Sequence, residues 1–96
     1  MKLVWTAGAK RDLREIVSYI WFDSPAAAER MRSRIETTAA YLEKQPFMGQ
    51  PGAIAGTREA IPHPSYRIVN QVSNELVSIL SVVHTAREWP PADEGE

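Results

Sequence analysis

The stretch at residues 65–89, SYRIVNQVSNELVSILSVVHTAREW, decides the fold of this chain, because it reads as a β-hairpin. Residues 66–72 alternate between two sets of side chains, which is typical of a strand with two different faces. Residues 73–75, Ser-Asn-Glu, supply turn chemistry, and residues 76–83 are apolar on both faces, as in a central strand. After the hairpin come three side chains that bear on function: His84, Arg87 and Trp89.

Two helices are predicted upstream of the hairpin. Within residues 7–22 the apolar side chains recur at the helical period, so one face of this segment is suited to a core. A second helix begins at Ser24 and Pro25, because Ser caps free N–H groups and Pro suits the first helical position. This helix is expected to end near Lys44, before Pro46. The short connection between the helices predicts an antiparallel helical hairpin.

The remaining segments predict strands on either side of the helices. Residues 1–5 read as a first strand, residues 46–56 as a loop rich in Pro and Gly, and residues 57–61 as another strand. The order is then β-α-α-β-β-β, an α+β fold in which the helical hairpin packs on one face of a small, mainly antiparallel sheet. The other face stays at least partly open. By strand alternation, Arg58 and Arg67 are both expected to point to that open face.

The composition indicates one small globular domain. The chain has 96 residues, 44% of them hydrophobic and 24% charged, and we expect a single domain over residues 1–91. Residues 92–96 form an acidic tail that is expected to be disordered. The net charge of −1 is far from the strongly basic balance of domains that hold nucleic acid by charge alone.

The sequence also limits the compartment and the chemistry. No apolar run is long enough for a secretory signal or a membrane span, so a cytoplasmic protein without membrane contact is expected. The chain has no cysteine, and its two histidines, His63 and His84, are not at metal-ligand spacing, so we predict no metal site and no cofactor. The glycines of residues 49–56 lack the Lys and the strand-to-helix context of a phosphate-binding loop.

Six stretches, taken in order, carry a resemblance to a known family. They are AKRDLREIVSYI, SPAAAERM, LEKQPFMGQPG, GTRE, YRIVNQV and ILSVVHTAREWP, and they span nearly the whole chain. Together they resemble the RelE/ParE superfamily of toxins from bacterial type II toxin–antitoxin systems, and GTRE and VVHTAREWP look most like its ParE branch. The resemblance implies the fold derived above. It also implies a growth-arresting toxin that is neutralised by a ParD-like antitoxin encoded beside it.

The two branches of this superfamily imply different targets. The ParE branch implies poisoning of DNA gyrase by binding, without enzymatic turnover, whereas the RelE branch implies cleavage of messenger RNA on the ribosome. In both branches the toxin reaches DNA only indirectly, through the DNA-binding part of the antitoxin. A third interpretation is an inactive family member that only binds its partner and represses their shared operon. We take the ParE-like reading as the main prediction and the endoribonuclease as the alternative.

The candidate target-binding residues are Arg58, Arg67, His84, Arg87 and Trp89. We expect the cations and aromatic rings among them to form one exposed face, suited to carboxylates, phosphates or a protein surface. In the nuclease alternative, His84 is the acid or base and Arg58 and Arg67 stabilise the phosphorane charge. That set is thin, because Ala60 occupies the second basic position of its strand and no Tyr follows the last strand. The structural alternative is that His84 only makes a hydrogen bond at a strand end.

A further prediction concerns the antitoxin. The chain carries many large apolar side chains for its length, and one small core has limited room to bury them. Ordinary core packing is one explanation, and the alternative is a groove that receives an amphipathic helix or strand of an antitoxin. Trp21 and Phe22, at the end of the first helix, are the candidate antitoxin contacts.

Overall fold

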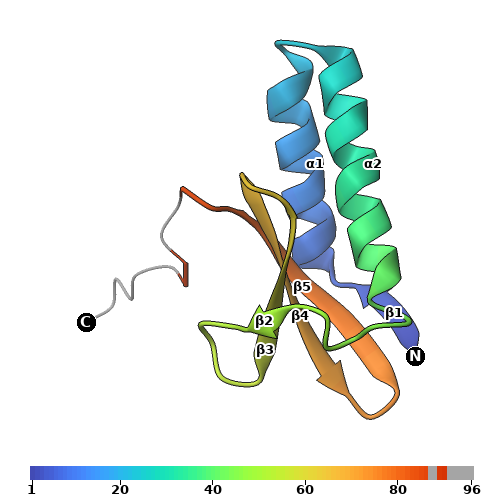
Figure 1. The fold of residues 1–96 in the computed structure, drawn as a ribbon. Coiled ribbons are helices and arrows are strands. Elements are labelled where there is room, and N and C mark those ends of the chain that lie inside the picture. The colour runs from blue at the N-terminus through green and yellow to red at the C-terminus, as the bar shows by residue number, and fades with distance from the viewer. Residues whose placement is uncertain (87–88, 91–96) are drawn as a thin grey trace.

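The computed structural model describes residues 1–86 and 89–90, and it confirms the expected α+β order (Figure 1). The elements are β1 (Lys2–Trp5), α1 (Ala7–Trp21), α2 (Pro25–Tyr41), β2 (Gln50–Pro51), β3 (Thr57–His63), β4 (Tyr66–Ser73) and β5 (Leu76–His84). The short strand β2 lies within the segment predicted as a loop. The predictions for Arg87 and for the tail at 92–96 fall outside the described residues.

The sheet has the strand order β1-β5-β4-β3-β2. Strand β1 runs parallel to β5, and every other neighbouring pair is antiparallel, so the prediction of a mainly antiparallel sheet is confirmed. Strands β4 and β5 form the hairpin read from the sequence, from the pair Tyr66–His84 to the pair Ser73–Leu76. Asn74 turns the chain with a φ of 54°, which is a conformation that Asn adopts more readily than most residues.

Both helices begin at a capping side chain, of which the one at Ser24 was predicted. Thr6 Oγ1 accepts the N–H of Ala9 at 3.2 Å, and Ser24 Oγ accepts the N–H of Ala27 at 3.1 Å. Helix α2 ends at Tyr41, a little before the expected end, because the chain turns there into the loop that leads to β2. The two helices lie side by side on one face of the sheet and extend beyond its edge (Figure 1). No helix among the described residues is long and apolar enough to cross a bilayer.

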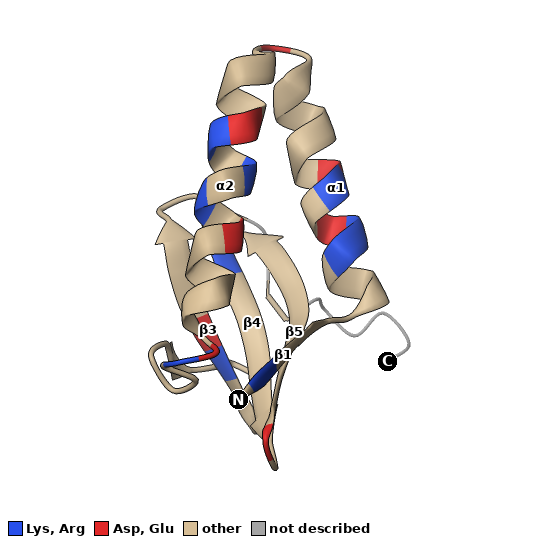
Figure 2. Cartoon of the chain, turned by 90° about the vertical axis from the view of Figure 1, so that its right-hand side faces the viewer, with Lys and Arg blue, Asp and Glu red and all other residues tan. Residues whose placement is uncertain are grey.

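The core lies between the helical hairpin and the sheet. It is built from the inner stripes of α1 and α2 and from one face of β3, β4 and β5; its largest fully buried side chains are Ile35, Leu42, Ile68, Ile79 and Val77. Burying a side chain of this size contributes about 1.5–3 kcal/mol to folding. Charged residues are spaced along both helices and are few on the central strands (Figure 2). The helices therefore bury one side and keep the other in solvent.

The core makes a direct prediction about stability. Ile68 of β4 is fully buried, whereas Ile61 of the neighbouring strand β3 is 54% exposed. We expect Ile68→Ala to lower the free energy of unfolding by about 2–5 kcal/mol, because the lost methyl groups leave a cavity. Ile61→Ala should cost less than about 1 kcal/mol. Urea denaturation followed by circular dichroism measures both, and equal losses would contradict this packing.

Candidate functional site

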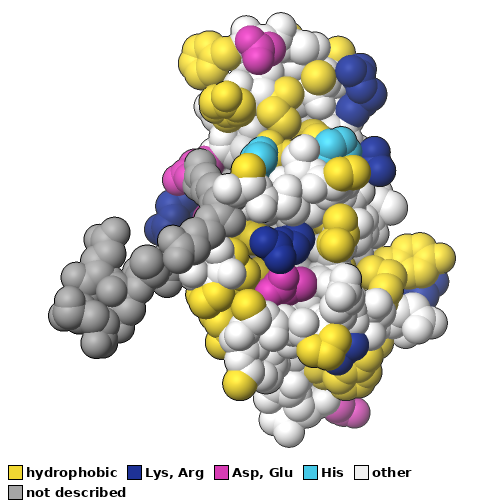
Figure 3. Space-filling model, turned by 60° about the vertical axis from the view of Figure 1, so that its left-hand side comes forward, with side chains coloured by type: hydrophobic (Ala, Val, Ile, Leu, Met, Phe, Trp, Pro, Cys, Tyr) yellow, Lys and Arg dark blue, Asp and Glu magenta, His cyan; other side chains and the backbone are white. Residues whose placement is uncertain are grey.

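Arg67 lies on the open face of the sheet, as predicted. Its neighbours in β4, Tyr66 and Ile68, belong to the core on the opposite face. The Arg67 Nη1 atom donates to Glu59 Oε1 at 3.1 Å, and the side chain of Arg67 is 28% exposed. Figure 3 shows a cationic and an acidic side chain in contact near the middle of this face. The charge of Arg67 is therefore already partnered within the chain.

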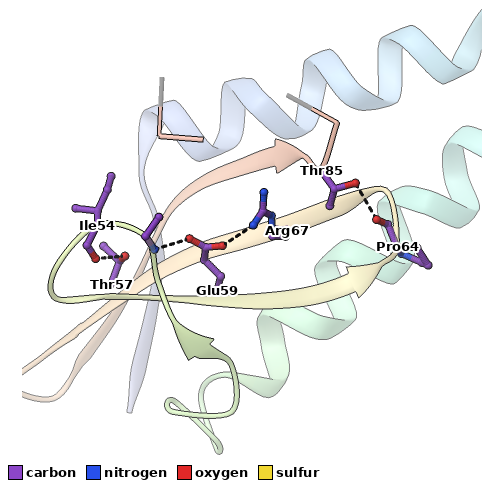
Figure 4. Close-up of polar contacts among 7 residues, drawn as sticks. Ile54, Thr57, Glu59, Pro64, Arg67 and Thr85 are labelled. Carbon is purple, nitrogen blue, oxygen red and sulfur yellow. Dashed lines mark hydrogen bonds and ion pairs between the residues drawn. The ribbon is translucent and has the colours of Figure 1, made fainter. Parts of the chain in front are cut away.

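Glu59 holds this pair and the neighbouring loop together (Figure 4). Its side chain is only 9% exposed, and its second oxygen, Oε2, accepts the backbone N–H of Ala53 at 2.9 Å. One carboxylate thus joins strand β3, strand β4 and the loop at residues 52–56. The close-up also shows Thr57 Oγ1 donating to the carbonyl of Ile54 within the same loop.

Arg58 lies on the face that carries the helices, so the prediction that it shares the open face with Arg67 is wrong. It sits directly opposite Asn70, and Asn70 is three residues from Arg67 in β4. Because strand side chains alternate, an odd separation places the two arginines on opposite faces. The Arg58 Nη2 atom donates to the carbonyls of Phe47, at 3.1 Å, and of Gly49. The guanidinium also lies 5.5 Å from the centre of the Phe47 ring.

The segment that receives Arg58 is tied to the sheet at two further points. Asn70 Nδ2 donates to the carbonyl of Pro46 at 3.5 Å. Gly49 packs so closely on the backbone of Glu59 that a Cβ there would collide with it. Arg58 therefore has a structural task, which is to hold the loop before β2 against the helix side of the sheet.

His84 also faces the helix side, away from Arg67. It is paired with the core residue Tyr66, and the two rings meet edge to face with centroids 5.2 Å apart. Its Nδ1 atom accepts the N–H of Ala86 at 3.0 Å, so the neutral ring carries its proton on Nε2. His63 makes the same kind of bond, since its Nδ1 accepts the N–H of Ser65 at 3.0 Å.

The predicted single cationic and aromatic face is therefore not assembled by the described residues. His84 and Arg58 lie opposite Tyr66 and Asn70, which are four residues apart in β4, or about 13 Å along an extended strand. Arg67 lies on the other face. Strand alternation separates the three side chains, because Arg58 and His84 pair with Asn70 and Tyr66, an odd number of residues from Arg67.

Trp89 is half-buried, and Arg87 lies outside the described residues. The indole Nε1 of Trp89 is buried and has no hydrogen-bond partner among residues 1–86 and 89–90. Buried indole N–H groups usually find an acceptor. Trp89 follows the end of β5 in the sequence, five residues after His84.

A cleft that was not predicted lies between α1 and the end of β5. It has a volume of about 430 Å³ and is lined by Asp12, Glu15, Ile16, Tyr19, Tyr66, Val82, His84 and Ala86. Asp12 Oδ2 forms its inner corner, where it accepts the Ser81 hydroxyl at 2.6 Å and the Val82 N–H at 3.0 Å. The sequence carried one signal for this cleft. Asp12, Ile16 and Tyr19 stand at i, i+4 and i+7 of α1, so their side chains share one face of the helix.

Aromatic side chains remain exposed where α1 ends. Tyr19 is 76% exposed, Trp21 50% and Phe22 88%. Figure 3 shows hydrophobic side chains gathered at the top of the view, over the end of the helical hairpin. The structure thus places Trp21 and Phe22 on the surface, away from the core. Among the described residues, no three His, Cys, Asp or Glu side chains are grouped so as to hold a metal ion.

A comparison with known protein families finds one that matches nearly the whole chain. Residues 3–89 match the family described as the ParE toxin of the type II toxin–antitoxin system parDE. The chain belongs to this family. The fold and the family named by resemblance are both confirmed, because the match spans nearly all the described residues.

Individual relatives agree with this family. The ParE-family chain is 40% identical over 90 residues to Y4kP of Sinorhizobium fredii, a toxin candidate by its name, and the match covers 93% of each chain. It is 41% identical over 86 residues to Toxin RelE2 of Caulobacter vibrioides, covering 90% of this chain and 97% of the relative. Among solved structures, the chromosomal ParDE toxin–antitoxin system from P. aeruginosa matches with a TM-score of 0.78 and 23% identity, over 88% of this chain and 95% of the other.

The ion pair on the open face predicts that Glu59→Ala lowers the stability of the fold more than Glu29→Ala does. Glu59→Ala leaves a largely buried guanidinium and the Ala53 N–H without their acceptor, so we expect a loss of about 2 kcal/mol or more in unfolding free energy. Glu29→Ala removes the exposed pair with Arg32 and should cost less than about 1 kcal/mol. Urea denaturation of both variants measures the difference. A Glu59→Ala variant as stable as Glu29→Ala would show that the buried carboxylate does not hold the loop.

Proposed function

We propose that this toxin arrests growth by binding and poisoning DNA gyrase in the cytoplasm, without catalytic turnover of its own. Membership of the ParE family supports the proposal, since gyrase poisoning is what resemblance to that branch implies. The observation that carries it is the separation of the would-be catalytic groups. His84 and Arg58 lie far apart on the helix side of the sheet, and Arg67 lies on the open face.

The chemistry of each group supports the same conclusion. Ribose cleavage needs a base close to the 2′-hydroxyl and a cation free to meet the charge of the phosphorane. The Nδ1 atom of His84 is occupied by the Ala86 N–H, so its free nitrogen is the protonated one and is not ready to act as a base. Arg67 is engaged by Glu59, and Arg58 by two loop carbonyls.

The proposed gyrase contacts lie at one end of the sheet. Strand β4 begins there and β5 ends there, so Arg67 and His84 flank this end from opposite faces. Trp89 and Arg87 follow β5 and complete the proposed set. Arg58 is not included, because it lies beside Asn70, farther along β4, and binds the loop before β2.

The proposed inhibitor is a ParD-like antitoxin that binds the exposed aromatic side chains at the end of the helical hairpin. Trp21 and Phe22 are its first contacts in this proposal, because large exposed apolar groups are typical anchors of an interface. The similar structure from P. aeruginosa is a ParDE toxin–antitoxin system, which supports a partner of this kind. DNA is then contacted through the antitoxin.

The second candidate function is a ribosome-dependent mRNA endoribonuclease. It is favoured by one observation, which is that a relative of 41% identity carries the name Toxin RelE2. In this alternative, His84 acts as the acid or base with Arg58 and Arg67, which requires these side chains to move together on the ribosome.

The test is pulse labelling of DNA and protein synthesis in bacteria just after induction of the chain, of His84→Ala and of His63→Ala. We expect DNA synthesis to fall first for all three. His84→Ala should weaken the effect by less than about tenfold, because contacts spread over a surface share the binding energy. Loss of a general acid or base would cost about 10²–10⁴-fold.

His63→Ala is the matched control, because it removes the same kind of Nδ1 bond to a backbone N–H two residues on. His63 lies opposite Tyr66 at the same end of the sheet, and it is not one of the proposed target contacts. If protein synthesis falls first and His84→Ala abolishes the effect while His63→Ala does not, the endoribonuclease is the correct function. Growth that continues normally while soluble wild-type chain accumulates would contradict both.

A further inference from the structure

Strand β5 carries one extra residue relative to its partner β4. The pair Val69–Ser81 is followed directly by the pair Asn70–Ile79, so Leu80 has no partner in β4. An extra residue of this kind is a β-bulge, and it moves every later side chain of its strand to the opposite face of the sheet. The bulge therefore decides which side chains the end of β5 presents on each face.

His84 owes its face to this bulge. With the bulge, His84 lies opposite Tyr66 and faces the helices. Without it, Val83 would lie opposite Tyr66, and His84 would turn to the face that carries Arg67. The apolar pattern selects between the two registers only weakly, because residues 82 and 83 are both Val and each register turns one of them toward the core. Contacts from outside the β4–β5 ladder therefore matter for the choice.

Contacts from α1 and its cap hold β5 on both sides of the bulge. Before the bulge, the carbonyl of Ile79 accepts the Thr6 N–H at 3.0 Å and the Thr6 hydroxyl at 2.9 Å. After the bulge, Asp12 Oδ2 accepts the Ser81 hydroxyl at 2.6 Å and the Val82 N–H at 3.0 Å. Strand β1 pairs with β5 only as far as Ile79, so from there on α1 takes the place of a neighbouring strand at this edge.

The bond from the Val82 N–H to Asp12 requires the bulge. In a regular strand, successive residues direct their backbone N–H and C=O groups to opposite edges, so groups on one edge are an even number of residues apart. The carbonyl of Ile79 and the N–H of Val82 both bind the α1 side, although they are three residues apart. In the register without the bulge, the Val82 N–H would point toward β4 and away from Asp12.

We propose that Asp12 is a positioning residue for the target-binding end of the sheet, because it holds the bulge of β5 and thereby keeps His84 on the helix side. The inference rests on the proposed gyrase function, in which His84 is a contact. Without the acceptor at Asp12, the end of β5 pairs with β4 in the register that lacks the bulge. His84 then changes face, and the chain that leads to Trp89 shifts by one residue, or about 3.4 Å along the strand. One carboxylate thus orients several of the proposed contacts.

Three variants isolate the acceptor oxygen of Asp12. Asp12→Ala removes the acceptor, whereas Asp12→Asn keeps one carbonyl oxygen, which can accept both bonds that Oδ2 accepts. Glu15→Ala is the matched control. Glu15 is an exposed acid one turn further along α1, and within the described part of the chain it makes no hydrogen bond to β5.

The register is read by NMR, as the nuclear Overhauser effect between the rings of Tyr66 and His84. The centroids of these rings lie 5.2 Å apart, so their edges are in contact. We expect the signal in wild type, in Asp12→Asn and in Glu15→Ala. In Asp12→Ala the signal should be lost and replaced by one between Tyr66 and Val83, because Val83 then lies opposite Tyr66.

Inhibition of gyrase supercoiling supplies the functional readout. We expect Asp12→Ala to raise the toxin concentration for half-inhibition about tenfold or more, because the whole end of β5 is displaced. This effect should exceed that of His84→Ala, which removes one contact only. Asp12→Asn and Glu15→Ala should stay within about twofold of wild type, because both keep the bulge.

Deletion of Leu80 separates positioning from general stability. The strand without Leu80 pairs regularly with β4, and His84 stays opposite Tyr66 with no contribution from Asp12. Adding Asp12→Ala to this deletion should therefore leave the ring-to-ring signal and the inhibition of gyrase as they are in the deletion alone. A carboxylate that only stabilised the domain would be missed equally in both backgrounds. The comparison also decides the case in which Asp12→Ala alone does not fold.

Three results would overturn the inference. Folded Asp12→Ala would keep the signal between Tyr66 and His84, or it would lose the signal and still inhibit gyrase at the wild-type concentration, or Asp12→Ala would do equal damage with and without Leu80. A wild-type chain that leaves gyrase fully active contradicts the proposed function instead. The NMR comparison is independent of gyrase, so it decides in that case whether Asp12 holds the bulge.

Discussion

The alternation of side chains along β4 is the constraint on which the rest of the structure depends. This strand is paired on both sides, with β3 and with β5, so its register is fixed and no side chain can change face without breaking two ladders. Tyr66, Ile68 and Asn70 point to the helices, and Arg67 points to the open face. Arg58 and His84 take their faces from their partners in this strand, Asn70 and Tyr66.

The buried polar groups follow from that register. Arg67 on the open face is met by Glu59, which also binds the loop at residues 52–56, while Arg58 on the helix side binds the loop before β2. One strand, β3, thus holds the same long loop from both faces of the sheet through adjacent residues of opposite charge. The cations that looked available for a substrate are used to stabilise a small domain, which favours action through surface contacts over catalysis.

Much of the fold was predictable because local signals agreed with one another. The cap at Ser24, the turn at Asn74 and the apolar stripes all pointed to a helical hairpin on a sheet. The face of Arg58 was not predictable, since alternation assigns faces only once the pairing with β4 is known. The cleft at Asp12 depends on where β1 stops beside β5, which is a tertiary distance that no local pattern encodes.

The central claim, that the toxin acts by binding gyrase and not by turnover, is tested most directly by titration. Purified toxin is added to purified gyrase and relaxed plasmid, and supercoiling is followed against the molar ratio of toxin to gyrase, beside a parallel assay of message cleavage on stalled ribosomes. We predict that supercoiling stops only when the toxin is at least equimolar with gyrase, and that the message stays intact. Two results together would contradict the account. Gyrase would keep its full activity in excess toxin, and messenger RNA would be cleaved at a toxin-to-ribosome ratio far below one.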